Sequence, residues 1–133
     1  MIRFLPIGAV LAALGGCVAP ISGPPLSGQW GGQHVGLSLD ESGGRLEYDC
    51  AAGTISEPVI PARDGSFAAE GTHTPGTGGP ARIDQVPASY SAHYTGEVDG
   101  STMTLTVEVP ARELVIGPLD LRRGAAPDLT RCL

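Results

Sequence analysis

The sequence predicts an all-β protein, a small antiparallel up-and-down β-barrel of seven or eight short strands, with a β-sandwich as the alternative. Three observations lead to this expectation. Apolar and polar residues alternate over most of the chain, Asp- and Gly-containing turn signals separate the alternating segments, and no segment sustains a helical period. Closure into a barrel would remove exposed strand edges, which otherwise promote aggregation.

The alternating segments are expected to be half-buried strands with one face turned inward. The first strand opens at Gly28, and the clearest later strands span residues 34–39, 45–50, 89–98 and 102–109. Weaker strands are expected over residues 55–60, 67–73 and 114–122. Turn signals lie at residues 40–44, 63–65 and 98–100, with Asp99-Gly100 as the strongest hairpin signal. Only residues 81–86, after Pro80, suggest a short helical turn.

The first sixteen residues are set apart from this pattern. One positive charge, Arg3, precedes an apolar run from Phe4 to Leu14. As a helix the run would be roughly 16 Å long, about half of the ~30 Å hydrocarbon core of a bilayer. It is therefore too short to span a membrane and has the parts of a secretory signal peptide, residues 1–16.

The end of this segment is more specific. Leu14, Gly15, Gly16 and Cys17 form the sequence LGGC, which resembles the lipobox of bacterial lipoproteins. The resemblance implies that Cys17 is diacylated, that the leader is cut before it, and that the new amino group is acylated; two or more acyl chains hold a protein stably at a membrane. Val18 stands where Asp would signal inner-membrane retention, which favours the outer membrane, facing the periplasm. The alternative is an ordinary signal peptide with a chance cysteine.

Residues 17–26 are rich in proline and lack periodicity, which is typical of an extended tether, and residues 27–133 are long enough for one β-domain. This mature region resembles small uncharacterised β-rich lipoproteins of bacteria, which share its LEYDC strand and its Arg-Cys-Leu ending. That resemblance implies a type of domain but no activity.

Charge excludes some partners. After the leader the chain has seven Arg, no Lys and 14 Asp plus Glu, without a basic patch. Binding of nucleic acid needs clustered cations against phosphates, so it is disfavoured. Contact with anionic lipid headgroups beyond the lipid tether is disfavoured for the same reason.

Cys50 and Cys132 remain as an even pair in an exported chain. A disulfide between them is the natural interpretation in an oxidising compartment, with two free buried thiols as the alternative. Closing a loop of about 80 residues would contribute roughly 4.5 kcal/mol in the chain-entropy model. Such a bond would clamp the C-terminus onto an early strand.

A second resemblance concerns the two ends of the domain. Gly28, Gln29 and Trp30 open the first strand, and Arg122 and Arg123 lie in the last. This arrangement resembles the calycin pattern of lipocalins and avidins, in which a G-x-W tryptophan packs under a late arginine at the closed end of a barrel. The chain is shorter than a typical lipocalin, has no counterpart of the lipocalins' middle motif, and has one tryptophan where avidin sites have several.

Catalytic patterns are missing. The loop from Gly71 to Pro80 has P-loop glycine spacing but no lysine for phosphates, so it is interpreted as a mobile loop. The histidines His34, His73 and His93 lack metal-ligand spacing, and two of the three fall on outward faces. No serine nucleophile motif occurs. We therefore expect no enzyme activity, no metal and no cofactor.

An eight-stranded barrel can hold side chains or one small ligand. If a cavity exists, Tyr48, Tyr90 and Tyr94 are the candidate walls, although core packing is the simpler role for them. The sequence thus favours an envelope lipoprotein with a non-catalytic binding, accessory or structural role and a protein partner. The alternatives are a carrier of a small apolar ligand, and a barrel resembling periplasmic inhibitors of secreted metalloproteases, which act through an N-terminal segment that lipidation would tether.

Overall fold

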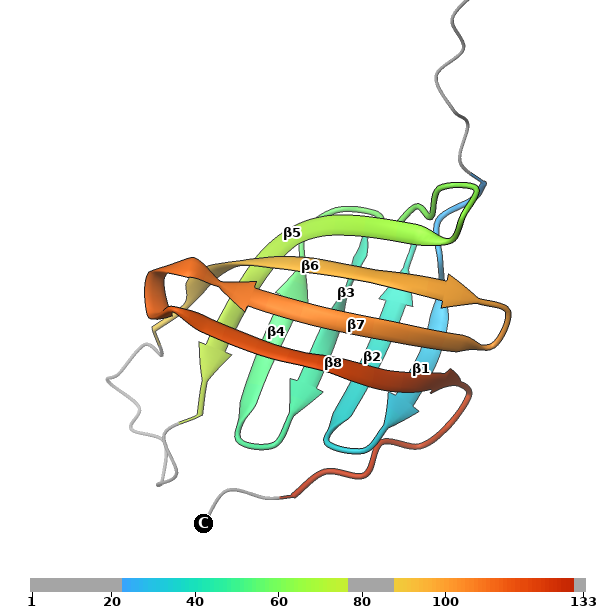
Figure 1. Cartoon of the computed structure of the whole chain (residues 1–133). Helices are drawn as coiled ribbons and strands as arrows, with labels where there is room; N and C mark the ends of the chain where they lie inside the picture. Colours follow the sequence, from blue (N-terminus) through green and yellow to red (C-terminus); the bar gives the residue numbers. More distant parts are fainter. Residues whose placement is uncertain (1–22, 77–87, 131–133) are drawn as a thin grey trace, which may run out of the picture.

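The computed structural model describes residues 23–76 and 88–130, in which eight antiparallel strands follow one another around a closed barrel (Figure 1). The predicted all-β barrel is confirmed, and the sandwich alternative is wrong. Within these residues no helix is long and apolar enough to cross a membrane.

The first four strands are short and joined by tight connections. They are β1 (Gly28–Gly32), β2 (Val35–Asp40), β3 (Gly43–Tyr48) and β4 (Ala51–Ile55). At the turn before β3, the Asp40 carboxylate accepts hydrogen bonds from the backbone and hydroxyl of Ser42, both 2.8 Å long. Bonds of this kind stabilise Asp at the start of a turn.

The last four strands are longer and run across the first four in Figure 1. They are β5 (Ser66–Pro75), β6 (Tyr90–Asp99), β7 (Thr102–Val109) and β8 (Leu114–Arg123). The predicted hairpin at Asp99-Gly100 joins β6 to β7, and Gly100 has the positive φ of 62° that such a turn needs. A 3-10 turn, η1 (Pro110–Arg112), joins β7 to β8.

The barrel has two ends, the entry end and the far end. The entry end is where the chain enters β1, and it carries the connections 41–42, 56–65 and 100–101. The far end carries the connections 33–34 and 49–50, together with η1. At the entry end, the Leu26 N–H donates to the Val59 carbonyl over 2.8 Å, which attaches the chain before β1 to the barrel.

Every strand contributes an apolar side chain to the interior. The alternation read from the sequence explains this, because successive residues of a strand point to opposite faces. The largest side chains that are almost fully buried are Trp30, Val35, Leu46, Val59, Tyr94, Leu105, Val107, Val109 and Leu121. The barrel is therefore filled by its own core.

Three local predictions are wrong. A strand was expected over residues 55–60, but β4 ends at Ile55, because Pro58 and Pro61 lack the N–H that a ladder needs. Cys50 was expected to be the last residue of the strand over residues 45–50. It instead lies exposed in the turn between β3 and β4 with a positive φ of 62°.

The third concerns the segment from Gly71 to Pro80, which was interpreted as a loop. Its first half continues β5 as far as Pro75 and pairs with β4. Residues 77–80 and the suggested helical turn at 81–86 lie outside the described residues.

The barrel closes where its first and last strands meet. Only two pairs join β1 to β8, Trp30 with Arg123 and Gly31 with Arg122. After β8 the chain turns back beneath the barrel in Figure 1 as an irregular segment, residues 124–130, which we call the strap. The strap runs past the connection 33–34, where Gln33 and Asp128 form an isolated parallel bridge.

Candidate functional site

The residues of the calycin-like pattern meet at the closing seam. The Arg123 guanidinium carbon lies 4.5 Å from the centre of the buried Trp30 ring, a cation–π arrangement. The Arg123 guanidinium and the Trp30 indole N–H both donate to the Ser27 carbonyl, over 3.3 and 3.4 Å. Gly28 precedes them at a positive φ of 99°. Of the two candidate arginines, Arg123 is thus the one that covers the tryptophan.

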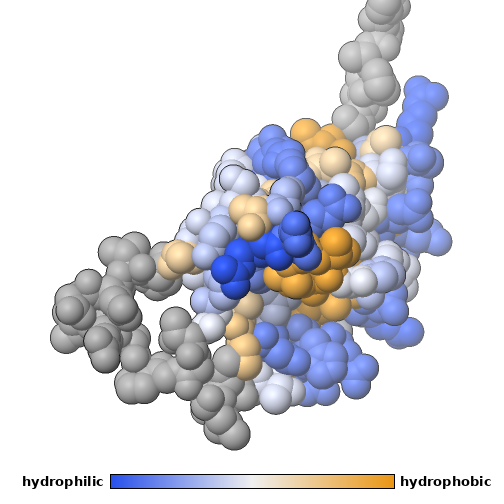
Figure 2. Space-filling view, turned by 60° about the vertical axis from the view of Figure 1, so that its left-hand side comes forward, coloured by the Kyte–Doolittle hydropathy of each residue, from blue (hydrophilic) through white to orange (hydrophobic). Residues whose placement is uncertain are grey.

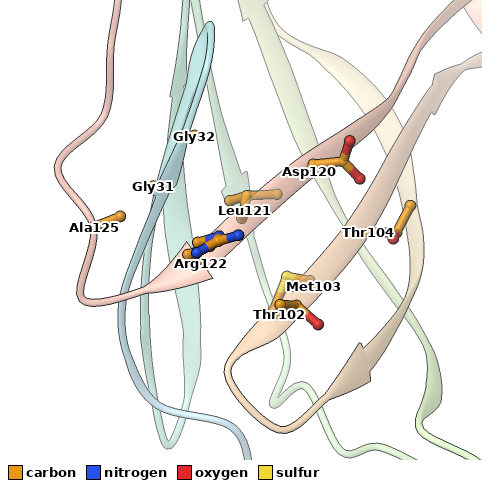
Figure 3. A pocket seen from close by; sticks show the side chains of 9 residues that line it. All are labelled: Gly31, Gly32, Thr102, Met103, Thr104, Asp120, Leu121, Arg122 and Ala125. Carbon is orange, nitrogen blue, oxygen red and sulfur yellow. The ribbon is translucent and has the colours of Figure 1, made fainter.

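Arg122 points elsewhere, into a groove on the outside of the seam (Figure 3). This groove has a volume of about 520 Å³ and is lined by Gly31, Gly32, Thr102, Met103, Thr104, Asp120, Leu121, Arg122 and Ala125. Its polar side chains come from β7 and β8. A second groove, of about 580 Å³, lies over β2 to β4 beside Pro127 of the strap.

The interior near the far end is more polar than the sequence predicted. The Tyr94 hydroxyl donates to the Thr72 carbonyl over 2.5 Å. The Tyr48 and His73 rings lie 5.8 Å apart, and among the described residues neither the Tyr48 hydroxyl nor the His73 Nδ1 has a hydrogen-bond partner. Gly53 faces these groups, and its missing side chain leaves the space that the hydroxyls occupy.

Burial keeps these side chains neutral. It raises the pKa of Tyr48, to which the neighbouring Tyr94 adds, and it raises the pKa of Tyr94 as well. Burial also lowers the pKa of His73, and the positive charge of Arg112 lowers it further. The three groups therefore form a neutral polar cluster within the core.

Tyr90 lies at the rim of the far end and is half-buried. The Arg112 guanidinium carbon is 5.1 Å from the centre of the Tyr90 ring, and a guanidinium N–H donates to its hydroxyl over 3.5 Å. Of the three tyrosines proposed as cavity walls, two thus belong to the core, and the third supports an arginine at the barrel's end.

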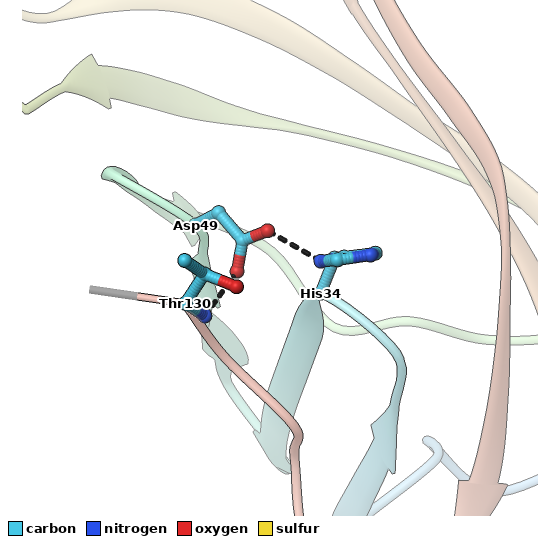
Figure 4. A network of polar contacts seen from close by, with 3 residues as sticks. All are labelled: His34, Asp49 and Thr130. Atoms are coloured by element: carbon cyan, nitrogen blue, oxygen red, sulfur yellow. Dashed lines mark hydrogen bonds and ion pairs between the residues drawn. The ribbon is translucent and has the colours of Figure 1, made fainter. Parts of the chain in front are cut away.

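A polar latch holds the strap against the far end (Figure 4). Asp49 hydrogen-bonds through one carboxylate oxygen to the His34 Nδ1, and its other oxygen accepts the Thr130 N–H over 2.6 Å. Two backbone bonds, His34 N–H to Asp128 carbonyl and Asp128 N–H to Gly32 carbonyl, continue the attachment. No local pattern in the sequence indicates this latch, because its members are far apart along the chain.

Glycines let the strap lie close to the sheet. Gly31 and Gly36 are paired across β1 and β2 on the outer face. A Cβ on Gly31 would lie 2.8 Å from the Ala126 carbonyl carbon, and one on Gly36 would lie 2.8 Å from the Pro127 Cβ. Two outward glycines side by side are the one feature from which sequence reasoning could have inferred a covering segment.

The histidines do not come together. His73 is buried, and His34 belongs to the latch. His93 lies on the outer face of β6, where its Nδ1 hydrogen-bonds over 2.7 Å to Glu70 on β5, and not to Glu97 of its own strand. Within residues 23–76 and 88–130, no three His, Cys, Asp or Glu side chains are grouped as a metal site would require.

The proposed lipidation motif, Leu14, Gly15, Gly16 and Cys17, lies outside the described residues, as does Cys132. Comparison with known proteins adds no family, since no protein-family model, curated protein or solved structure matches the chain. The candidate functional surfaces therefore rest on the geometry above.

Proposed function

We propose that this chain is a lipid-anchored protein of the bacterial cell envelope whose barrel is a non-catalytic protein-binding module. The filled interior carries this proposal. Buried side chains from all eight strands occupy the inside of the barrel, so the outer surface and the two ends are what the domain offers to a partner. A carrier of a small apolar ligand would need that interior space for its cargo.

The point where the chain enters the barrel supports an anchored domain. The backbone of Leu26 is hydrogen-bonded to that of Val59 at the entry end, so residues 17–25 would form the connection to an acylated Cys17. Fully extended, nine residues span about 30 Å. The entry end would then face the membrane and the far end would face away from it.

The strap supports the disulfide proposed for Cys50 and Cys132. Asp49 precedes Cys50 in the turn and binds the backbone of Thr130, two residues before Cys132. The latch thus brings the described chain toward the exposed turn that carries Cys50. A bond there would hold the strap covalently, in addition to its hydrogen bonds.

Intact mass of the protein extracted from membranes, with and without reduction, tests the anchor and the disulfide together. We expect the mass of a chain starting at Cys17 with its acyl groups, and a gain of two hydrogens on reduction. The Cys17→Ser variant should be released from the membrane fraction. A wild-type chain recovered in soluble form with an unmodified Cys17 would contradict the proposed anchor.

Photo-crosslinking in intact cells tests the binding role. A photoreactive residue is placed in turn at outward positions of each strand, such as Ser38, Thr54, Thr95 and Val115. The proposal expects a discrete crosslinked protein at one cluster of positions. The same weak background at every position would oppose it.

A further inference from the structure

Among residues 23–76 and 88–130, no strand pairs with one side of the start of β8. All of β8 runs beside β7, but β1 pairs only with Arg122 and Arg123 at its other end. In Figure 1, β8 begins at the left of the view, whereas β1 lies at the right, beside the other end of β8. Since alternate residues of an edge strand direct their N–H and C=O groups away from the sheet, residues 114–116 present backbone groups to an incoming strand.

The rest of this edge is blunted. The pairing of β8 with β7 is interrupted between Ile116 and Leu119 by a bulge, and Pro118 within it has no N–H to donate. Bulges and prolines are features by which proteins stop unwanted strand pairing. The open part is thus confined to Leu114–Ile116, which we call the β8 edge.

The β8 edge is also apolar and exposed. Val115 is 62% exposed and Leu114 is 37% exposed, which makes them two of the three large apolar side chains exposed among the described residues. An apolar area beside strongly hydrophilic atoms is visible on this side of the molecule in Figure 2. Exposed apolar side chains next to free backbone groups are what a recognised strand contacts in β-augmentation.

Negative charge surrounds these side chains. Glu108 lies directly opposite Val115 across the β7–β8 ladder, and Glu113 immediately precedes the edge. On the same outer face, Glu108 is paired with His93 on β6, and His93 is paired with Glu70 on β5. The nearby cation, Arg112, is placed over the Tyr90 ring.

The carboxylates beside the β8 edge favour a positively charged partner over a second copy of this chain. A second copy of the chain would bring the same carboxylates against themselves, and the chain as a whole has a net charge of −6. A segment that alternates aliphatic and basic residues would instead place its apolar side chains beside Leu114 and Ile116 on one face. Its cations would then lie on the opposite face, which carries Glu108.

We propose that the β8 edge binds an extended segment of another protein, one that carries aliphatic and basic residues in alternation and adds as a strand beside Leu114–Ile116. The inference rests on the proposed binding function and specifies its surface. It also places that surface at the far end, away from the proposed lipid anchor.

Synthetic peptides test the inference on the full mature domain. The probe is a seven-residue peptide of alternating valine and lysine, and the comparison peptides replace either lysine by glutamate or valine by serine. Titrations are followed through the amide NMR signals of the protein. We expect binding of the Val-Lys peptide only, with the largest shifts and slowed amide exchange at residues 114–116.

Two variants locate the contact. Leu114→Ser preserves the net charge and removes an apolar side chain from the face that the valines would contact. We expect it to weaken Val-Lys binding by about tenfold, which corresponds to about 1.4 kcal/mol. Ile60→Ser is the matched control, since Ile60 is a 41% exposed aliphatic residue at the entry end, and its affinity should stay within about twofold of wild type. Both positions are exposed, and equal melting temperatures would show that folding is intact.

Several results would overturn the inference. They are equal binding of the Val-Glu peptide, shifts centred on the groove at the seam, equal effects of the two variants, no binding of any peptide, or self-association of the protein through the β8 edge. Crosslinks to a protein partner elsewhere on the barrel would separate the two proposals, because the binding function would then stand while this surface would be wrong.

Discussion

Replacing Gly53 by alanine should destabilise the barrel, because β4 passes directly against the polar cluster in the core. A Cβ at this position would lie closer than 3.0 Å to both the Tyr94 hydroxyl and the Thr72 carbonyl oxygen. These two atoms form the 2.5 Å hydrogen bond described above. Neither can move away without weakening that bond.

The size of the effect follows from three contributions. Forcing one methyl group into a packed core costs about 1–3 kcal/mol. Losing the hydrogen bond costs about 1 kcal/mol. Alanine also lowers the conformational entropy of the unfolded chain, which offsets about 0.4–1 kcal/mol of this destabilisation. We therefore expect a loss of about 2 kcal/mol in the free energy of unfolding and a melting temperature lower by about 10 °C.

A double-mutant cycle isolates the cause. Tyr94→Phe removes the hydroxyl that the new methyl group would meet, so Gly53→Ala should cost at least about 1 kcal/mol less in that background. Urea unfolding of the four proteins, followed by the fluorescence of the single tryptophan, measures the coupling. Costs that add to within about 0.3 kcal/mol would refute the proposed contact.

Three other predictions concern the seam, the strap and the buried histidine. Arg123→Ala should shift the tryptophan emission to longer wavelength and cost about 0.5–1 kcal/mol, whereas Arg122→Ala, its matched control, should leave the emission unchanged. Gly36→Val should displace the strap, so limited proteolysis should cut residues 124–130 faster than in wild type, and equal rates would contradict the packing described. Because folded His73 has a pKa below the usual 6.5 and stays neutral while the unfolded residue is protonated, stability should fall as the pH drops below about 6.5. His73→Gln should remove that part of the decline between pH 6.5 and 5, measured by thermal unfolding, and an unchanged decline would contradict the shift.

The strands that alternate most strictly could be predicted from the sequence. Residues 102–109 show why, since Met103, Leu105, Val107 and Val109 are all buried and every intervening residue but one is exposed. The start of β4 could not be predicted in this way. Its inward residues include Gly53, whose small size gives no apolar signal although its position is set by the tyrosine hydroxyls.

The far end was harder still to predict. The latch joins His34, Asp49 and Thr130, and the strap has no period of its own. Contacts between distant segments leave no local pattern, so the sequence predicted neither. The open β8 edge was missed for a related reason, because which residues of a strand lack a partner depends on the length and register of its neighbour.

The narrow seam between β1 and β8 affects how the polypeptide can reach its native state. Its two pairs join the beginning and the end of the domain, so the circle of strands cannot be completed until the last strand has emerged. Contacts of such large sequence separation slow folding, since a long loop must be ordered before they form. A nascent chain with this topology therefore cannot close its barrel until β8 has been synthesised.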